Sequence, residues 1–214
     1  RNENMNTATK FPTTEKMLKL LDETKLEQTP RPYLGASALG HPCDKKLWLD
    51  FRCAMPQNFP IKTHFKFEDG FYSEEITAER LLVNPKIKLS TGDKGRQHSV
   101  MKMGGHFGGN VDGIIIGVEQ DPLEEMIWEH KCVGQSEFNK FKNIIVNKNE
   151  KIPLAKWNYQ YYVQAQVYMK LFGMKKHFIT VASAGSRDYI EAVTLRDPEC
   201  IAIAWNRANN IIAT

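Results

Sequence analysis

The chain has 214 residues, of which 42% are hydrophobic and 25% charged, and its net charge is +4. This length and composition fit one globular domain with a full hydrophobic core, or one domain plus a small appendage. No apolar run approaches the roughly 18 residues that a membrane span needs, and the polar start RNENMNTATK is not a signal peptide, so we expect a cytoplasmic protein without a membrane partner.

Three helices are expected in the first part of the chain, over residues 14–28, 37–52 and 66–83. The first is amphipathic and is ended by Pro30. The second is interrupted near Pro42, and the Asn84–Pro85 pair ends the third. These helices predict a mainly helical N-terminal portion, at about residues 14–60, within a single domain that covers residues 1–214.

The middle of the chain then changes to short, β-branched or alternating segments that turn residues separate. Strands are expected over residues 86–90, 98–103, 110–118 and 125–133, as a meander of three or four strands. Helices follow at 136–147 and 156–173, then a strand pair at 177–184 and 188–194 and a closing helix that begins at Asp197. This order predicts a mixed α/β domain, with a central, mainly antiparallel or mixed sheet flanked by helices.

The four cysteines, Cys43, Cys53, Cys132 and Cys200, include no CxxC pair. Their spacing argues against a structural zinc site and, in a cytosolic protein, against disulfides. We expect reduced, mostly buried thiols for all of them but Cys43.

Charge is distributed unevenly along the chain. Residues 131–176 contain nine lysines against Glu137 and Glu150, a local excess of +7, whereas residues 65–130 contain seven basic and twelve acidic residues, a local balance of −5. Lysine-rich surfaces are usually only solvated, so the basic segment adds little to the case for a polyanionic partner. The acidic segment is more informative, because it contains candidate metal ligands.

The sequence feature most suggestive of chemistry is Asp112 followed by Glu129-His130-Lys131. On a strand, the side chains of residues i and i+2 point to the same face, so Glu129 and Lys131 project together and His130 points away. If the two strands pair as a hairpin through a turn at 119–124, Asp112, at the start of the preceding strand, comes close to Glu129.

Two carboxylates and an amine in one cluster suit a hard cation such as Mg²⁺ or Mn²⁺, which takes one or two carboxylates together with waters and phosphate oxygens. Such a metal lowers the pKa of a bound water and stabilises charge that develops on a phosphate. Lys131 can orient or deprotonate that water, or neutralise the phosphorus centre. The competing interpretation is a surface ion pair, which is common for an ExK strand.

The pattern GNVDGIIIG…EMIWEHK resembles the core of the PD-(D/E)XK nuclease superfamily, within the RecB-like and YqaJ-like phage exonuclease branch of lambda-exonuclease-like enzymes. Three further segments resemble that branch in the same order. They are residues 35–48 (GASALGHPCDKKLW), the GxxxE motif of residues 70–74, and the YxxQxxxY motif of residues 161–168. Together these motifs cover about two thirds of the chain, from residue 35 to residue 172.

The resemblance implies a restriction-endonuclease-like core and assigns roles to further residues. Glu74 would reach the metal site, although helix geometry leaves its neighbour Glu75 open as the alternative. Gln164 would lie beside the catalytic carboxylates, and the backbone carbonyl of His130 would be a metal ligand. The predicted metal ligands are therefore Asp112, Glu129, Glu74 and His130.

The YxxQxxxY motif also has a direct interpretation. Tyr161, Gln164 and Tyr168 lie at i, i+3 and i+7 and share one helical face. A glutamine is a poor residue for a plain apolar stripe, because its amide needs hydrogen-bond partners when buried. The alternative is an amphipathic helix with Gln164 at its edge. Candidate DNA contacts are Tyr161, Tyr168, Lys45, Lys46, Arg52, Lys140 and Lys142.

Some relatives in this superfamily hold an iron–sulfur cluster with one cysteine in the N-terminal helix and three near the C-terminus. Here only Cys200 follows the YxxQxxxY motif, so we expect no such cluster.

Three functions remain open. They are an exonuclease acting on duplex DNA ends in phage-type recombination or repair, a structure- or site-specific endonuclease, and a catalytically silent nucleic-acid-binding module. The resemblance places the protein in a bacterial or phage-infected cytosol and allows for a homo-oligomer or a single-strand annealing partner.

Overall fold

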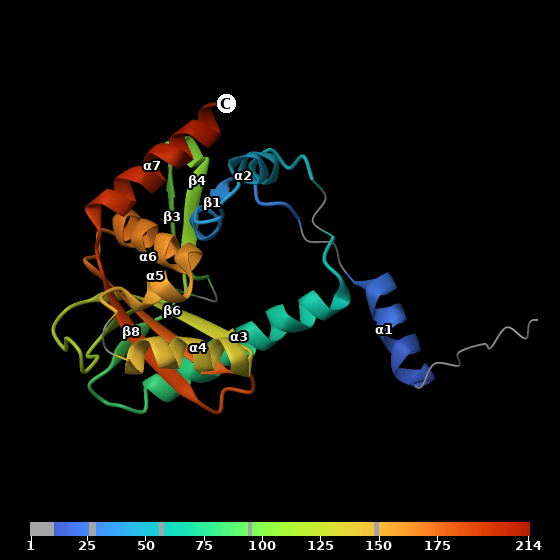
Figure 1. The fold of residues 1–214 in the computed structure, drawn as a ribbon, viewed down its shortest axis with the longest axis horizontal. Coiled ribbons are helices and arrows are strands. Elements are labelled where there is room, and N and C mark those ends of the chain that lie inside the picture. The colour runs from blue at the N-terminus through green and yellow to red at the C-terminus, as the bar shows by residue number, and fades with distance from the viewer. Residues whose placement is uncertain (1–10, 26–28, 56–57, 94–95, 148–149) are drawn as a thin grey trace, which may run out of the picture.

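The computed structural model describes residues 11–25, 29–55, 58–93, 96–147 and 150–214 (Figure 1). In chain order the elements are α1 (Pro12–Thr24), β1 (Leu34–Gly35), the 3₁₀ turn η1 (Ala36–Ala38), α2 (Asp44–Phe51), α3 (Ile61–Leu81), β2 (Lys88–Ser90), β3 (His98–Lys102), the 3₁₀ turn η2 (Met103–Gly105), β4 (Phe107–Val111), β5 (Gly113–Ile116), β6 (Met126–Val133), α4 (Gln135–Val146), α5 (Pro153–Trp157), α6 (Tyr159–Phe172), β7 (Lys176–Ser183), β8 (Tyr189–Leu195) and α7 (Pro198–Ala213). No helix in these ranges is both long and apolar enough to cross a bilayer.

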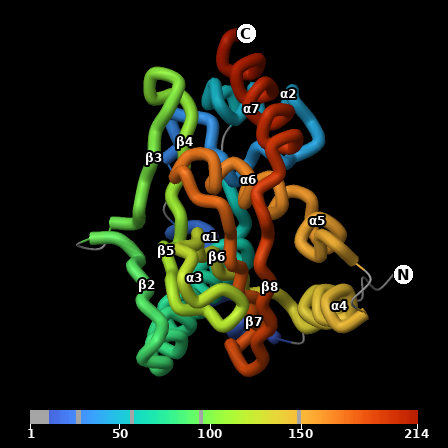
Figure 2. The backbone as a smooth tube through the Cα atoms, turned by 90° about the vertical axis from the view of Figure 1, so that its left-hand side faces the viewer, coloured from blue at the N-terminus to red at the C-terminus, as the bar shows by residue number. Residues whose placement is uncertain are grey.

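Two mixed sheets form the centre of the molecule. The larger has the strand order β2-β5-β6-β7-β8, in which β6 and β7 are parallel and the other neighbours antiparallel. The smaller has the order β1-β4-β3, with β1 parallel and β3 antiparallel to β4. The tube view shows the long β3–β4 hairpin rising beside α6 and α7 (Figure 2). The predicted mixed α/β fold is confirmed.

The prediction of a single strand over residues 110–118 is wrong. The segment forms two strands in different sheets, because β4 pairs with β3 whereas β5 pairs with β2 and β6. Asp112 is the one residue between them, in a bend, and not the start of a strand. The β-branched residues of NVDGIIIGV lie on both sides of the bend, so the sequence does not reveal the change of partner strand.

The expected hairpin between β5 and β6 is present, with Gly113 opposite Trp128. A glycine is needed at position 113, because a Cβ there would lie 2.8 Å from Leu89 Cδ1 and 3.0 Å from the carbonyl oxygen of Ser90. The close approach of β2 and β5 therefore depends on the residue next to Asp112.

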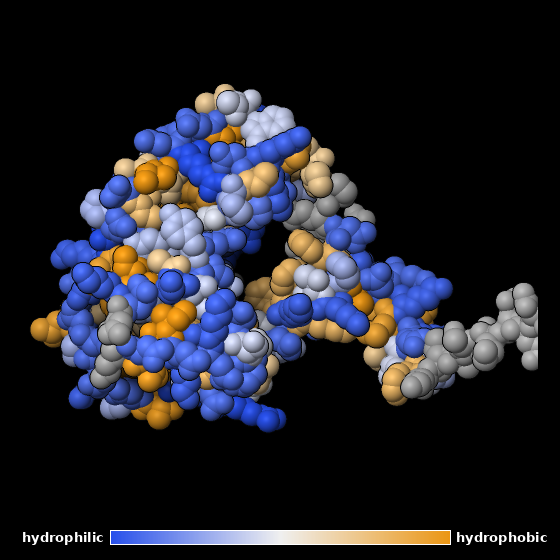
Figure 3. Space-filling model, viewed as in Figure 1, coloured by the Kyte–Doolittle hydropathy of each residue, from blue (hydrophilic) through white to orange (hydrophobic). Residues whose placement is uncertain are grey.

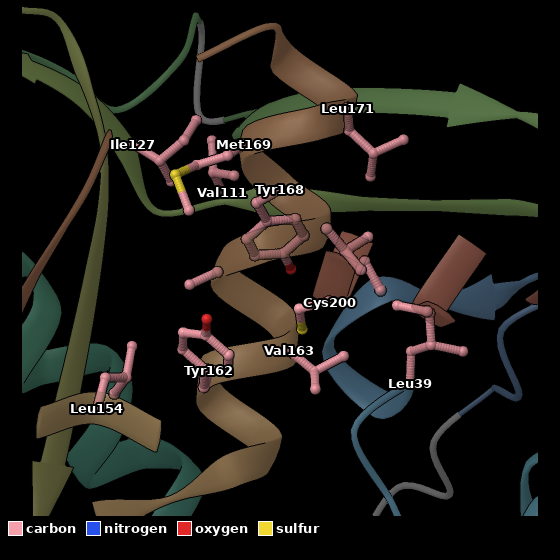
Figure 4. Close-up of a cluster of buried hydrophobic side chains, with 14 of the residues drawn as sticks. Leu39, Val111, Ile127, Leu154, Tyr162, Val163, Tyr168, Met169, Leu171 and Cys200 are labelled. Atoms are coloured by element: carbon pink, nitrogen blue, oxygen red, sulfur yellow. The ribbon is translucent and has the colours of Figure 1, made fainter. Parts of the chain in front are cut away.

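The larger hydrophobic core surrounds α6. Residues of this helix pack against Ile127 of β6, Val111 of β4, Leu154 of α5 and Cys200 of α7 (Figure 4). A smaller core lies on the opposite face of the five-stranded sheet and is centred on Trp128. Side chains of β6 therefore alternate between a face covered by α6 and a face covered by α3.

The helix expected over residues 156–173 is interrupted at Asn158. This residue has extended backbone angles, and its side chain accepts a hydrogen bond from the Tyr161 amide at 3.2 Å, which caps α6. Asparagine is a favoured N-cap because its oxygen satisfies a free amide of the first turn. Gly173, with φ of +73°, ends α6 as expected.

Other helix boundaries also differ from the prediction. The helix expected over residues 37–52 is the short turn η1 followed by α2, which begins only after Pro42. The third helix begins earlier than expected, at Ile61 directly after Pro60. The first ends at Thr24, and the last residues of its predicted range, 26–28, lie outside the described residues.

The expectation of buried thiols is wrong for Cys53, which is exposed, and Cys132 is only half-buried. Cys53 follows the end of α2 with a φ of 52°, so it belongs to a surface turn. Cys200 is buried in the larger core, and Cys43 is exposed.

The N-terminal half of α3 extends outward from the sheet toward α1 (Figure 1). Helix α1 buries none of its residues. In the view of Figure 3 the body over the sheets is mainly hydrophilic with several hydrophobic patches, and apolar side chains also show on α1 and on the outward part of α3.

Candidate active site

The predicted catalytic residues come together where the two sheets join. Asp112 lies in the bend between β4 and β5, and Glu129 and Lys131 follow on the neighbouring strand β6. Glu74 reaches them from α3 and Gln164 from α6. We call Glu74, Asp112 and Glu129 the carboxylate cluster.

Glu129 is buried and accepts hydrogen bonds through one of its two oxygens. Oε1 accepts from Lys131 Nζ at 2.5 Å and from Gln164 Nε2 at 2.8 Å. Oε2 is also buried, yet it has no hydrogen-bond partner among the described residues. A buried carboxylate oxygen without a donor is costly unless another group satisfies it.

Asp112 is held by the backbone amide of His130 and by the side chain of Gln97. Its Oδ2 accepts from the backbone amide of His130 at 2.8 Å, and Gln97 Nε2 lies 3.4 Å from its Oδ1. The same Gln97 nitrogen lies 3.4 Å from Glu74 Oε1. Gln97 therefore bridges two members of the carboxylate cluster.

Sequence reasoning missed Gln97. The pairing of β3 with β4 places His98 opposite Val111, so the next step of the register places Gln97 opposite Asp112. That register is the only signal that identifies Gln97, and the sequence motifs do not give it. Between the two candidate glutamates on α3, Glu74 points toward the cluster and Glu75 is exposed.

Burial and mutual repulsion disfavour the ionised form of the three carboxyl groups in the cluster. Burial, followed by the charge of Asp112, raises the pKa of Glu129 to about 8 and that of Glu74 to about 7, and burial also raises the pKa of Asp112. Burial disfavours the ammonium of Lys131, but Glu129 and Asp112 outweigh it and raise the Lys131 pKa. Lys131 is therefore a cation at neutral pH.

Lys131 also has contacts beyond Glu129. Its ammonium donates to the backbone carbonyl of His130 at 2.9 Å and lies 5.5 Å from the centre of the Tyr161 ring. At this distance a cation is attracted to the face of the ring. The side chain of Tyr161 therefore helps to hold Lys131 over Glu129.

Tyr168 closes the other end of the same face of α6. It is buried against Gly109, where a Cβ would lie 2.8 Å from Tyr168 Cε1. Burial raises the pKa of its hydroxyl, and the negative charge of Glu129 adds to this effect. Tyr161, Gln164 and Tyr168 thus lie along the side of α6 that faces the cluster, as the helical spacing predicted.

The imidazole of His130 lies on the opposite face of β6, as expected from the alternation of side chains. Its ring contacts Ser73 of α3 and Thr180 of β7, while its carbonyl oxygen is on the Lys131 side. The ring is therefore separated from the carboxylate cluster by the backbone of β6.

The donor set suits a divalent cation that keeps part of its water shell. Within the described ranges, no group of three or more His, Cys, Asp or Glu side chains is arranged to hold a metal ion alone. Mg²⁺ needs only one or two carboxylates beside waters and substrate phosphates. Asp112 and the unpartnered Oε2 of Glu129 meet that requirement.

The basic residues considered as DNA contacts lie on α2, at its end, and on α4. On α2, Lys45 is exposed, Lys46 pairs with Asp50 at 2.5 Å, and Arg52 lies over the rings of Trp48 and Phe51.

On α4, Lys142 is exposed and Lys140 lies 3.6 Å from Glu137. This helix directly follows β6, the strand that carries Glu129 and Lys131.

No family model and no curated protein matches the chain. Among solved structures, an alkaline exonuclease (LHK-Exo) from Laribacter hongkongensis is similar, with a TM-score of 0.58 and 13% identity over 86% of this chain and 88% of that one. Its complex with dAMP gives a TM-score of 0.58 and 13% identity over 85% and 86%. A phage-related exonuclease from Haemophilus somnus 129PT has a TM-score of 0.49 and 14% identity, over 91% of this chain and 94% of that one.

The first of these likenesses extends over nearly the full length of both chains, and it agrees with the resemblance of the four sequence motifs. The chain therefore shares the fold of this alkaline exonuclease.

Proposed function

We propose that the chain is a deoxyribonuclease that depends on Mg²⁺ or Mn²⁺ and removes nucleotides from duplex DNA ends. The observation that carries the proposal is the buried Oε2 of Glu129, which has no partner among the described residues and lies in a cluster whose carboxylate pKa values are raised. A cation would satisfy this oxygen and relieve the repulsion within the cluster.

Asp112, Glu129 and the His130 carbonyl would hold the metal, with Glu74 adding negative charge beside them. When bound, the metal would supply an activated water and stabilise charge on the scissile phosphate. Gln164 and Lys131 orient Glu129 through its Oε1, which would leave Oε2 for the cation.

Lys131 would place a positive charge beside the reacting phosphate. The carboxylates raise its pKa, so in the metal-free protein Lys131 is charged at neutral pH and is a hydrogen-bond donor and point charge. A donor that is fixed before the reaction stabilises developing negative charge without further reorganisation.

The preference for DNA ends is supported by the similarity to an alkaline exonuclease. A role in phage-type recombination or repair is the one that the resemblance of the sequence motifs implies. Lys140 and Lys142 of α4 and the half-buried Tyr161 of α6 would contact the DNA backbone. The sequence-based assignment of Tyr168 as a DNA contact is wrong, because Tyr168 is buried against Gly109. An endonuclease on the same core is the second candidate, because the carboxylate cluster does not encode end recognition.

A gel assay on linear and closed circular duplex DNA with Mg²⁺ or Mn²⁺ tests the proposal. We expect loss of the linear form alone, and no loss when a chelator is present. Cleavage of the circle would identify an endonuclease, and no cleavage of either form would identify a binding module.

Asp112→Ala and Glu129→Ala are each expected to abolish cleavage while the fold is retained, because the metal loses a charged ligand. Glu75→Ala is the matched control, since Glu75 is an exposed carboxylate next to the cluster. Metal-dependent cleavage at the wild-type rate by either of the first two variants would refute the assignment.

A further inference from the structure

The side of α3 that contacts the sheet is unusually polar. Ser73 and Thr77 are the only buried residues on this helix, and Arg80 continues the same face at i+7. Ala78 and Leu81 add partly buried apolar contacts to the smaller core. The position of α3 therefore depends on a few directional hydrogen bonds more than on apolar packing.

The central group in these hydrogen bonds is the imidazole of His130. Its Nε2 lies 2.8 Å from Ser73 Oγ and its Nδ1 lies 3.0 Å from Thr180 Oγ1. Thr180 Oγ1 also accepts from Trp128 Nε1 at 3.0 Å. Both ring nitrogens thus have a hydrogen-bond partner, and these two bonds fix the orientation of the ring between α3 and β7.

Ser73 is held from a second direction by the turn between β7 and β8. Ser186 Oγ lies 2.7 Å from Ser73 Oγ, and the Ser186 carbonyl accepts from Arg80 Nη1 at 2.6 Å. Ser186 has a φ of 50°, a conformation that costs a non-glycine residue about 1 kcal/mol. The hydrogen bonds to α3 hold the turn in this conformation.

The two ends of the Ser73–His130 hydrogen bond are each next to the carboxylate cluster in sequence. Ser73 directly precedes Glu74 on α3. His130 lies between Glu129 and Lys131, and its backbone amide donates to Asp112 at 2.8 Å. A shift of α3 relative to β6 would therefore move Glu74 relative to Asp112 and Glu129.

We propose that Ser73 and His130 are positioning residues, whose hydrogen bond fixes Glu74 of α3 against Asp112 and Glu129 and so sets the affinity of the cluster for a divalent cation. The inference rests on the proposed function, because it assigns the cluster to metal binding. It concerns the imidazole and the serine hydroxyl, on the face of β6 away from the metal.

Mn²⁺ binding to the purified full chain, followed by the electron paramagnetic resonance of free Mn²⁺, tests this inference without a cleavage assay. Ser73→Ala is expected to weaken Mn²⁺ binding by about tenfold, the smaller end of the effect of losing a group that orients metal ligands. Ser73→Thr retains the hydroxyl and is expected to bind Mn²⁺ within about twofold of wild type.

Ser183→Ala is the matched control. Ser183 is a buried serine at the start of the same turn, where its hydroxyl accepts from the Asp188 amide at 3.2 Å and contacts neither α3 nor His130 among the described residues. Thermal unfolding of both alanine variants establishes that each is folded. Equal weakening of Mn²⁺ binding by Ser183→Ala, or no weakening by Ser73→Ala, would overturn the inference.

The wild-type protein separates this inference from the proposed function. Binding of Mn²⁺ without cleavage of any DNA would reject the nuclease activity alone, and the comparison of Ser73 variants would still decide the positioning role. Failure of the wild type to bind Mn²⁺ would reject both.

Discussion

The raised pKa values of the carboxylate cluster make the stability of the metal-free protein depend on pH. A carboxyl whose pKa is higher in the folded state contributes stability that is present below its ordinary pKa and lost as pH rises through the folded value. For Glu74 this window runs from about 4.5 to about 7. We therefore expect metal-free protein to lose stability between about pH 4.5 and pH 8, and Glu74→Gln to lose less.

The size of the effect follows from the pKa of Glu74. At about 1.4 kcal/mol per pKa unit, a rise from 4.5 to about 7 corresponds to at most about 3.4 kcal/mol. Glu74 is only partly buried, so solvent screening reduces this to about 1–2 kcal/mol. For a chain of this length, each kcal/mol corresponds to a change in Tm of about 2–4 °C.

Urea unfolding in the presence of a chelator, at about pH 4 and about pH 8.5, measures the free energy of unfolding on both sides of this window. Glu75→Gln is the control, because it removes an exposed carboxylate from the neighbouring position of α3. Its pH dependence is expected to match that of wild type. The same pH dependence in wild type and Glu74→Gln would show that Glu74 is not under the strain we describe.

Three other outcomes are expected. Lys131→Ala should bind linear duplex DNA nearly as wild type does but lose on the order of a hundredfold in single-turnover cleavage, whereas normal cleavage with weaker binding would make Lys131 a phosphate contact. Gly40→Ala should lower the urea midpoint by the equivalent of about 1–3 kcal/mol, because its Cβ would lie 2.5 Å from Gln160 Cα in α6; an unchanged midpoint would contradict this close approach of Gly40 to α6. Elemental analysis of purified protein should find no stoichiometric iron, and a brown preparation would disprove this expectation.

The parts of the site that the sequence predicted depend on local periodicity. Glu129 and Lys131 share a face because side chains alternate along a strand, and Tyr161, Gln164 and Tyr168 share a face because of the helical spacing within α6. The approach of Asp112 to Glu129 could be predicted because a hairpin with a short turn joins β5 to β6. Each of these arrangements is set by residues close together in sequence.

The parts that the sequence did not predict depend on contacts between distant segments. Gln97 reaches Asp112 only through the register of β3 and β4, and Ser73 meets His130 only because α3 crosses the sheet at that point. No spacing within one element encodes such contacts.

Fold prediction from the sequence has the same limit. The β-branched residues at 110–118 identified extended chain but gave no sign that Asp112 separates strands of two sheets. The parallel pairing of β6 with β7 was also not predicted, because α4, α5 and α6 lie between these strands in sequence.

The single-residue junction at Asp112 has a consequence for how the chain tolerates changes in length. Successive residues of a strand point to opposite faces, so one residue inserted between Val111 and Gly113 would turn over every side chain of β5 while β4 kept its orientation. Ile115, which is buried in the smaller core, would then face the other side of the sheet. Insertions should therefore be accepted in the turn at 119–124, whereas the junction accepts substitutions only.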